Sequence, residues 1–151
     1  MQRKIFFRNI FISVVVFLFL IAGGFFLSKI SKKDKNIFKV GKCDFFIEEA
    51  RTVEERRKGL SDRDFVCDNC GMLFYFDKPS VYGFWMKDMR FDLDILWISG
   101  EEIIGIDEGI SRSRQENFYP PREVDKVLEI KAGKIRECEI AINQKIKKYK
   151  D

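Results

Sequence analysis

Hydrophobic and polar positions divide the chain into two parts. The first is a long apolar run, and the second consists of short apolar segments separated by polar residues. Residues 9–28 carry no charge and consist mainly of Phe, Ile, Leu and Val. A helix rises ~1.5 Å per residue, so this run is long enough to cross a hydrocarbon core ~30 Å thick. We therefore expect residues 1–28 to be a membrane anchor or signal segment that contacts lipid through residues 9–28. Ala22-Gly23-Gly24 resembles a cleavage site, but the run is long for a signal peptide, which favours a retained single-pass anchor.

Residues 29–36 read as a short polar linker, and residues 37–151 then form one β-rich domain. Apolar runs bounded by Gly, Pro, Asp and Ser predict short strands. We expect strands from residue 37 onward and at 72–76, 82–87, 93–98, 102–107 and 124–130, and 140–146 fits a last strand.

One short helix interrupts this pattern. Thr52 and Glu55 have the spacing of a capping box, in which the hydroxyl and the carboxylate each accept a hydrogen bond from a free backbone N–H at the helix start. Gly59 suits the helix end, so we predict a helix over 53–58. Closely spaced strands with one helix predict a mainly β fold, a small antiparallel barrel or sandwich, preceded by an N-terminal transmembrane helix.

Charge is unevenly distributed along the chain, which has 28 Lys and Arg, 24 Asp and Glu and a net charge of +4. The positive excess lies in residues 1–36, on both sides of the apolar run, so the positive-inside rule does not decide the orientation. Residues 37–151 are close to neutral and have no basic stripe interleaved with aromatic residues. We therefore expect no binding to nucleic acid.

The segment FWMKDM, residues 84–89, places aromatic, thioether and charged side chains side by side. With strand alternation, Phe84 and Met86 share one face and Trp85 and Lys87 share the other. Phe84 and Met86 suit a core. Trp85 and Lys87 are then suited to a cleft in which the indole stacks on a ligand ring and the amine pairs with an anion. The alternative is that Trp85 packs under a loop and Lys87 is only solvated.

Two acidic residues interrupt apolar strands, Asp94 in LDILWI and Glu129 in VLEI. A buried carboxylate is costly unless it is paired. Arg51 and Arg63, on either side of the predicted helix, offer forked sets of donors, so we expect ion pairs that fix the helix to the sheet. Catalysis by the two acids is the alternative. We assign no catalytic residue, and the candidate binding residues are Arg51, Arg63, Trp85, Lys87, Asp94 and Glu129.

The four cysteines are Cys43, Cys67, Cys70 and Cys138. Structural disulfides are favoured for a domain outside the cytoplasm, and all three pairings are open. A zinc site of four thiolates and a Cu(I) site built from Cys67, Cys70 and Met72 are weaker alternatives. We expect no cofactor. The chain has no histidine, which excludes histidine-based catalytic triads.

Five segments in order resemble the bacterial and archaeal domain of unknown function 192 family: EARTVEERRKGLSDR, CGMLFYF, FWMKDM, LDILWI and VLEIKAG. The resemblance implies a small, mainly β domain with one short helix, often behind an N-terminal signal or anchor, and it implies no settled activity. The chain departs from the family pattern at two places. Asp88-Met89 stands where the family has Asn-Thr, and Asn143-Gln144 stands where it has a Gly-Asp turn. The pair Cys67 and Cys70 is also additional to that pattern.

Stacking and charged side chains without a nucleophile–base pair favour a binding function. We predict a membrane-anchored domain outside the cytoplasm that binds an unknown small ligand or an envelope protein. The first alternative is an enzyme that uses Asp94 and Glu129 as acid and base on an envelope polymer. The second is the handling of Cu(I) by cysteine and methionine.

Overall fold

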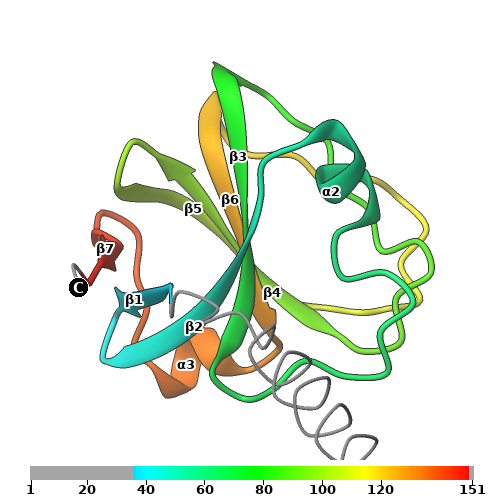
Figure 1. The fold of residues 1–151 in the computed structure, drawn as a ribbon, viewed down its shortest axis with the longest axis horizontal. Coiled ribbons are helices and arrows are strands. Elements are labelled where there is room, and N and C mark those ends of the chain that lie inside the picture. The colour runs from blue at the N-terminus through cyan, green and yellow to red at the C-terminus, as the bar shows by residue number, and fades with distance from the viewer. Residues whose placement is uncertain (1–35, 150–151) are drawn as a thin grey trace, which may run out of the picture. The chain divides into compact units, whose positions relative to one another are not determined.

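The computed structural model describes residues 36–149, which form a seven-stranded sheet and two short helices (Figure 1). The elements in chain order are β1 (Ile37–Val40), β2 (Cys43–Ala50), α2 (Val53–Lys58), β3 (Cys70–Ser80), β4 (Leu93–Ser99), β5 (Glu102–Ile110), β6 (Val124–Lys131), α3 (Lys134–Glu137) and β7 (Lys147–Lys148). The strand order is β5-β4-β6-β3-β2-β1-β7. Neighbouring strands are antiparallel, except that β2 and β3 are parallel.

The sheet curves so that its two edges approach each other at one end. The Ile103 N–H donates to the Gln144 carbonyl at 2.9 Å, and the Asn143 N–H donates to the Ile103 carbonyl at 2.8 Å. Glu102 of β5 also forms an isolated bridge with Lys145, just before β7. The domain is thus a half-barrel with few short helices. Its mainly β class is as the sequence predicts, whereas the parallel pairing of β2 with β3 and the helix α3 were not predicted.

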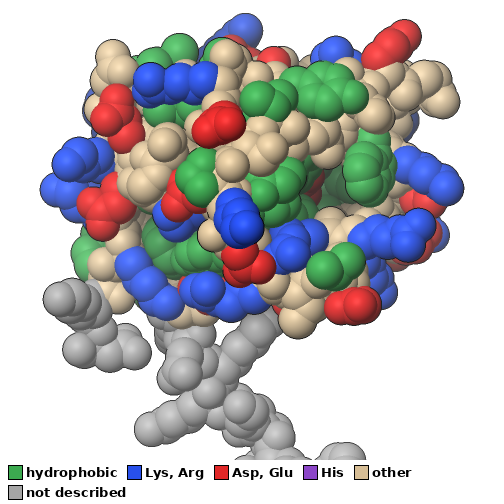
Figure 2. Space-filling model, turned by 90° about the horizontal axis from the view of Figure 1, so that it is seen from above, with side chains coloured by type: hydrophobic (Ala, Val, Ile, Leu, Met, Phe, Trp, Pro, Cys, Tyr) green, Lys and Arg blue, Asp and Glu red, His purple; other side chains and the backbone are tan. Residues whose placement is uncertain are grey.

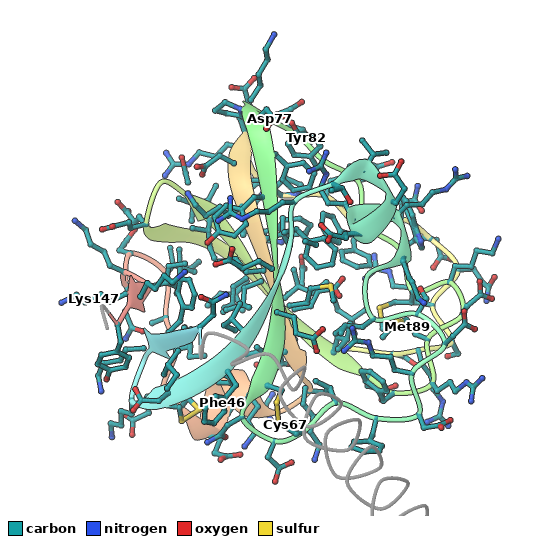
Figure 3. The ribbon with its side chains drawn as sticks, in the orientation of Figure 1. Phe46, Cys67, Asp77, Tyr82, Met89 and Lys147 are labelled. Carbon is teal, nitrogen blue, oxygen red and sulfur yellow. A yellow bond between two sulfur atoms is a disulfide. The ribbon has the colours of Figure 1, made fainter. Side chains whose placement is uncertain are left out.

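Each face of the sheet carries its own hydrophobic core. The inner core includes Phe45, Leu96 and Ile130. The other face packs Phe74, Trp97 and further side chains against α2 and the long loops, and we call it the outer core. Figure 3 shows Lys147 on one side of the sheet and Met89 on the other, with side chains filling the space on both sides. On the surface in Figure 2, charged side chains of both signs are interspersed with hydrophobic ones.

The helix α2 begins and ends where its capping residues predict. The Thr52 hydroxyl accepts from the Glu55 N–H at 3.2 Å, and the Glu55 carboxylate accepts from the Thr52 N–H at 2.9 Å. Gly59 follows with a φ of 51°, which suits a residue without a Cβ atom. The capping box therefore fixes where α2 begins, and Gly59 is where the chain leaves α2 and turns toward the outer core.

Two segments predicted as strands are instead loops. Residues 82–87 pair with the sheet only through the bridge between Phe84 and Phe118, although Phe84 and Met86 are buried and Trp85 and Lys87 are exposed, as strand alternation predicts. Residues 140–146 form no strand beyond the bridge at Lys145, because Asn143 has a φ of 70° and reverses the chain before β7.

The predicted anchor at residues 9–28 lies outside the described residues. None of the helices within residues 36–149 has the length and apolarity that a membrane crossing requires.

Both departures from the family pattern fall where the backbone is left-handed. Asp88 has a φ of 59° and Asn143 a φ of 70°. Gly, Asn and Asp adopt this conformation more readily than other residues. The replacement of Asn by Asp at 88 and of Gly by Asn at 143 therefore preserves the turn at each position.

Replacing Asp88 by alanine is expected to lower the free energy of unfolding by about 1 kcal/mol, because alanine is strained at positive φ. Replacement by glycine or asparagine should cost less than alanine does. Urea unfolding of the three variants measures the difference. Equal losses for alanine and glycine would mean that the Asp88 side chain, and not its backbone conformation, is what matters.

Candidate functional site

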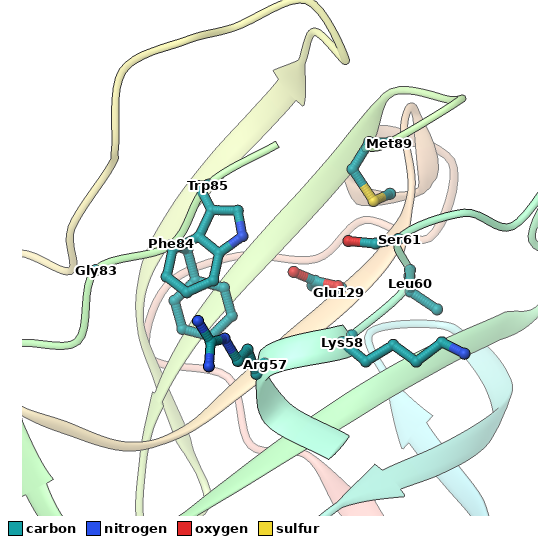
Figure 4. Close-up of a pocket in the computed structure, with 10 residues that line it drawn as sticks. Arg57, Lys58, Leu60, Ser61, Gly83, Phe84, Trp85, Met89 and Glu129 are labelled. Carbon is teal, nitrogen blue, oxygen red and sulfur yellow. The ribbon is translucent and has the colours of Figure 1, made fainter. Parts of the chain in front are cut away.

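A pocket lies over the outer core, between the C-terminal end of α2 and the loop that carries Trp85. Its cavity volume is ≈ 50 Å³, well below the ~300–1,000 Å³ of sites that enclose a whole small molecule, so it has room for one group of a ligand. Leu60, Phe84 and Met89 supply apolar walls, and Arg57 and Lys58 supply charge at the end of α2. We call this the Glu129 pocket, because that carboxyl lies at its centre, with Trp85 on one side and Met89 and Ser61 on the other (Figure 4).

The Glu129 side chain is buried and has no partner. The residue is 6% exposed, and no hydrogen bond or ion pair within residues 36–149 reaches its carboxyl. In the same part of the chain, every fully sealed side-chain nitrogen or oxygen has a hydrogen-bond partner. The Glu129 carboxyl must therefore open onto the pocket, which agrees with its position in Figure 4.

Burial also changes the charge of this carboxyl. Desolvation raises the pKa of Glu129 to about 8, and the positive charge of Arg63 opposes this rise without cancelling it. At neutral pH the group is then mostly protonated and can both donate and accept a hydrogen bond. The pocket thus offers an uncharged polar group surrounded by apolar walls, with two cations nearby.

Trp85 is placed by backbone hydrogen bonds on both sides of it. The Phe84 N–H donates to the Phe118 carbonyl at 2.9 Å, and the Phe118 N–H donates to the Phe84 carbonyl at 3.0 Å. The Ser61 hydroxyl donates to the Lys87 carbonyl at 3.0 Å. Trp85 is 45% exposed, so its indole is free to stack on a ligand ring while its backbone is fixed.

The two candidate arginines bind other acids than those predicted. Arg63 forms a two-pronged ion pair with Glu48, at 2.7 and 3.0 Å. Glu48 lies across β3 from Glu129 on the same face of the sheet, which explains how the charge of Arg63 reaches the pocket. Arg51 pairs with Glu49 at 2.8 Å and lies over the ring of Tyr75. The predicted ion pairs with Asp94 and Glu129 are therefore wrong.

Asp94 is a structural residue on the opposite face of the sheet. It is fully buried, and its two oxygens accept from the Gly109 N–H at 2.8 Å and the Ile135 N–H at 2.9 Å. Glu129 is opposite Ile95 in the register of β4 and β6, so the side chain of Asp94 points to the other side. The two acids cannot act as an acid–base pair, which removes the geometric basis of the enzyme hypothesis.

The cysteines form two disulfides, Cys43–Cys138 and Cys67–Cys70. Neither pair presents free thiolates, and Met72 is buried in the outer core. Within residues 36–149, no three His, Cys, Asp or Glu side chains gather as a metal site would require. The paired cysteines in residues 36–149 therefore do not offer the thiolates that the Cu(I) and zinc alternatives need.

The structure brings together only part of the predicted site. Trp85 and Glu129 line the same pocket, and Trp85 and Lys87 line an adjacent hollow. Sequence reasoning missed Arg57 and Lys58, since basic residues in the last turn of a helix are commonly solvated and complement the helix dipole. The only signal that could have found them is their closeness to Gly59, which turns the chain toward the outer core.

Three comparisons place this geometry among known proteins. The model of the family DUF192, described as "Uncharacterized ACR", matches residues 36–148. A crystal structure of a protein of unknown function from Novosphingobium aromaticivorans DSM 12444 is 26% identical, with a TM-score of 0.69, over 74% of this chain and 83% of that chain. A candidate transcription regulator from Sinorhizobium meliloti 1021 is 24% identical, with a TM-score of 0.72, over 75% and 92%. No curated protein matches significantly.

Proposed function

The chain belongs to the DUF192 family of uncharacterised proteins, and from that premise we propose that its β-domain is a membrane-anchored binding module. In this proposal the domain lies outside the cytoplasm and binds a small, ring-shaped ligand with hydroxyl groups. The ring stacks on Trp85, and one hydroxyl group enters the Glu129 pocket. Glu129 carries the proposal, because a buried carboxyl without a partner is costly and is kept most readily where a ligand uses it.

The chemistry of the walls favours such a ligand. An indole face and apolar neighbours suit the flat, apolar side of a sugar-like ring. The protonated carboxyl of Glu129 can donate to one ligand hydroxyl and accept from another. Arg57 and Lys58 add affinity for a negatively charged substituent.

Binding without chemistry is the simpler interpretation of this pocket. Glu129 is the single carboxylate among its lining residues, and the other apolar-strand acid, Asp94, faces away. The neighbouring Ser61 hydroxyl donates to the Lys87 carbonyl at 3.0 Å, so its proton is not directed at Glu129. A carboxyl without a second acid supplies polarity more readily than turnover.

Two features support the location. Residues 9–28 have the length and composition of a membrane span. Two disulfides within one small domain are typical of an oxidising compartment outside the cytoplasm.

The test measures the thermal midpoint of the full chain in detergent with glucose, N-acetylglucosamine, glucuronate and galacturonate. A ligand at 100 times its Kd adds about 2.7 kcal/mol, which raises the midpoint by several degrees. We expect a shift with the acidic sugars that is lost in Trp85→Ala and in Glu129→Met, an apolar replacement of similar length.

Lys147→Ala, on the far side of the sheet, should keep the shift and serves as the control. If the acidic sugars shifted the midpoint equally in the wild type, Trp85→Ala, Glu129→Met and Lys147→Ala, the ligand would bind elsewhere. No shift with any of the sugars would contradict a sugar-like ligand in this pocket.

A further inference from the structure

A second hollow adjoins the Glu129 pocket and shares Trp85 with it. Its volume is ≈ 500 Å³, and its other lining residues are Met86, Lys87, Asp88, Arg112, Arg114, Gln115 and Asn117. We call it the arginine hollow. Because the exposed indole of Trp85 lines both spaces, a ligand long enough to leave one space can enter the other across its face.

The charge of this combined surface differs from that of the domain. Its lining contains five cations and two acids, whereas residues 37–151 as a whole carry slightly more acids than bases. One of the two acids, Glu129, is mostly protonated at neutral pH because burial raises its pKa to about 8. The surface is therefore the kind that attracts a ligand with several negative charges.

The loop that supplies the two arginines is held in place next to Trp85. The Arg112 N–H donates to the Asp92 carboxylate at 2.9 Å, and the Arg114 N–H donates to the Ser111 carbonyl at 3.0 Å. The guanidinium of Arg114 lies over the Phe118 ring, 5.3 Å from its centroid. Phe118 forms the backbone bridge to Phe84 described above, which ties this loop to the segment that carries Trp85.

A third hollow, lined by Lys39, Lys42, Lys145 and Lys147, is also basic but lacks these features. No aromatic side chain lines it. Lys42 is paired there with Glu139, and Lys39 with Asp44 at 4.0 Å. Charge alone does not distinguish the two basic hollows, whereas the indole and the buried carboxyl do.

We propose that the Glu129 pocket and the arginine hollow form one elongated site for a linear carbohydrate polymer with repeated negative charges. One substituent of a sugar ring enters the Glu129 pocket while the ring stacks on Trp85, and the chain continues over the indole. Its next anionic groups then meet Lys87, Arg112 and Arg114. This inference rests on the proposed function, and it specifies that the ligand is a polyanionic glycan and not a single sugar.

The experiment compares galacturonate with its hexamer on the full chain in detergent. Affinity is expressed per sugar unit, which corrects for the number of units that the hexamer offers. We expect the hexamer to bind at least about tenfold more tightly per unit, because the second set of contacts forms within one ligand. Raising the salt concentration should weaken the hexamer more than the monomer, since more charge pairs are screened.

The decisive variant is Arg112→Ala/Arg114→Ala, and the matched control is Lys145→Ala/Lys147→Ala, which removes two cations from the third hollow. The first variant should lose the preference for the hexamer and keep the binding of galacturonate. The control should keep both. The loop keeps its anchor in the decisive variant, because alanine at position 112 retains the backbone N–H that donates to Asp92.

Each other outcome has a separate meaning. If galacturonate binds and the hexamer gains nothing per unit, the elongated site is overturned while the proposed function stands. If neither binds, the proposed function fails with it. Inorganic polyphosphate of equal charge tests charge alone, and if it binds as tightly as the hexamer and depends on the same residues, the carbohydrate assignment is wrong.

Discussion

The wild-type protein is expected to lose stability as the pH rises from 4.5 to 8, and replacing Glu129 by glutamine is expected to abolish most of this loss. The pKa of this carboxyl rises from 4.5 to about 8 in the folded protein. Between these values the folded state binds more protons than the unfolded state. The free energy of unfolding therefore decreases as the pH rises, by about 1.4 kcal/mol per pH unit for this group, and levels off above pH 8.

The size of the effect follows from the width of that window. Between pH 5 and pH 7.5 the free energy of unfolding of the wild-type protein should fall by about 3 kcal/mol because of this group. The Glu129→Gln variant should not show this fall. Below pH 4.5 the carboxyl is neutral in both states, so it contributes no pH dependence there. Urea unfolding of the two proteins across this range measures the difference.

The control for this prediction is Glu101→Gln, in the exposed turn between β4 and β5. It shows how much the loss of one exposed carboxylate changes the free energy of unfolding. If the difference between Glu129→Gln and wild type stayed constant from pH 5 to pH 7.5, the carboxyl would be ionised and solvated. The account of the pocket as a site with a protonated acid would then be wrong.

Removing the disulfide Cys43–Cys138 is expected to be the most damaging of the covalent changes. The bond joins residues 95 positions apart, from the start of β2 to the residue after α3. In the chain-entropy model, a disulfide that closes a loop of that size stabilises the folded state by about 4.7 kcal/mol. One that closes a loop as short as Cys67–Cys70 contributes about 2 kcal/mol. The Cys43→Ala/Cys138→Ala variant should therefore unfold at a midpoint more than about 10 °C below wild type.

The Cys67→Ala/Cys70→Ala variant is the matched comparison, because it removes the same number of cysteines and one bond. Thermal unfolding of both variants without reductant gives the two losses. A loss for Cys43/Cys138 no larger than that for Cys67/Cys70 would mean that loop length does not control the contribution of these bonds.

The sequence predicts best the features that depend on near neighbours. The helix at 53–58 follows from a hydrogen-bonded exchange between residues three apart, Thr52 and Glu55. The strands β4 and β6 follow from apolar runs bounded by turns. The exposure of Trp85 and Lys87 follows from alternation, even though the segment is a loop with a single bridge.

The misses come from contacts between residues far apart along the chain. Asp94 is satisfied by backbone amides 15 and 41 positions away. A sequence pattern identifies a buried acid but does not indicate which loop will offer it an N–H. The parallel pairing of β2 with β3 is equally hidden, because α2 and the loop up to Cys70 decide how the chain returns.

Two residues of the Glu129 pocket, Trp85 and Glu129, could be predicted from the sequence, but their proximity could not, because it depends on contacts between distant parts of the chain. An acid in an apolar strand indicates a costly buried carboxyl, and an exposed Trp beside a Lys indicates a binding edge. That Trp85 and Glu129 meet depends on Gly59 and on the Ser61 contact with the Lys87 carbonyl, which bring two loops over the outer core. Arg112 and Arg114 join this surface only because Phe118 bridges to Phe84.

The most direct test of the central claim uses the two tryptophans of the chain. Trp85 is exposed beside the pocket, whereas Trp97 is buried and donates its indole N–H to Asp107 at 2.6 Å. In the nitrogen–proton spectrum of the ¹⁵N-labelled full chain, galacturonate should shift the indole signal of Trp85 saturably at pH 6 and leave that of Trp97 in place. If the Trp85 signal does not move at saturating sugar, the Glu129 pocket is not the ligand site.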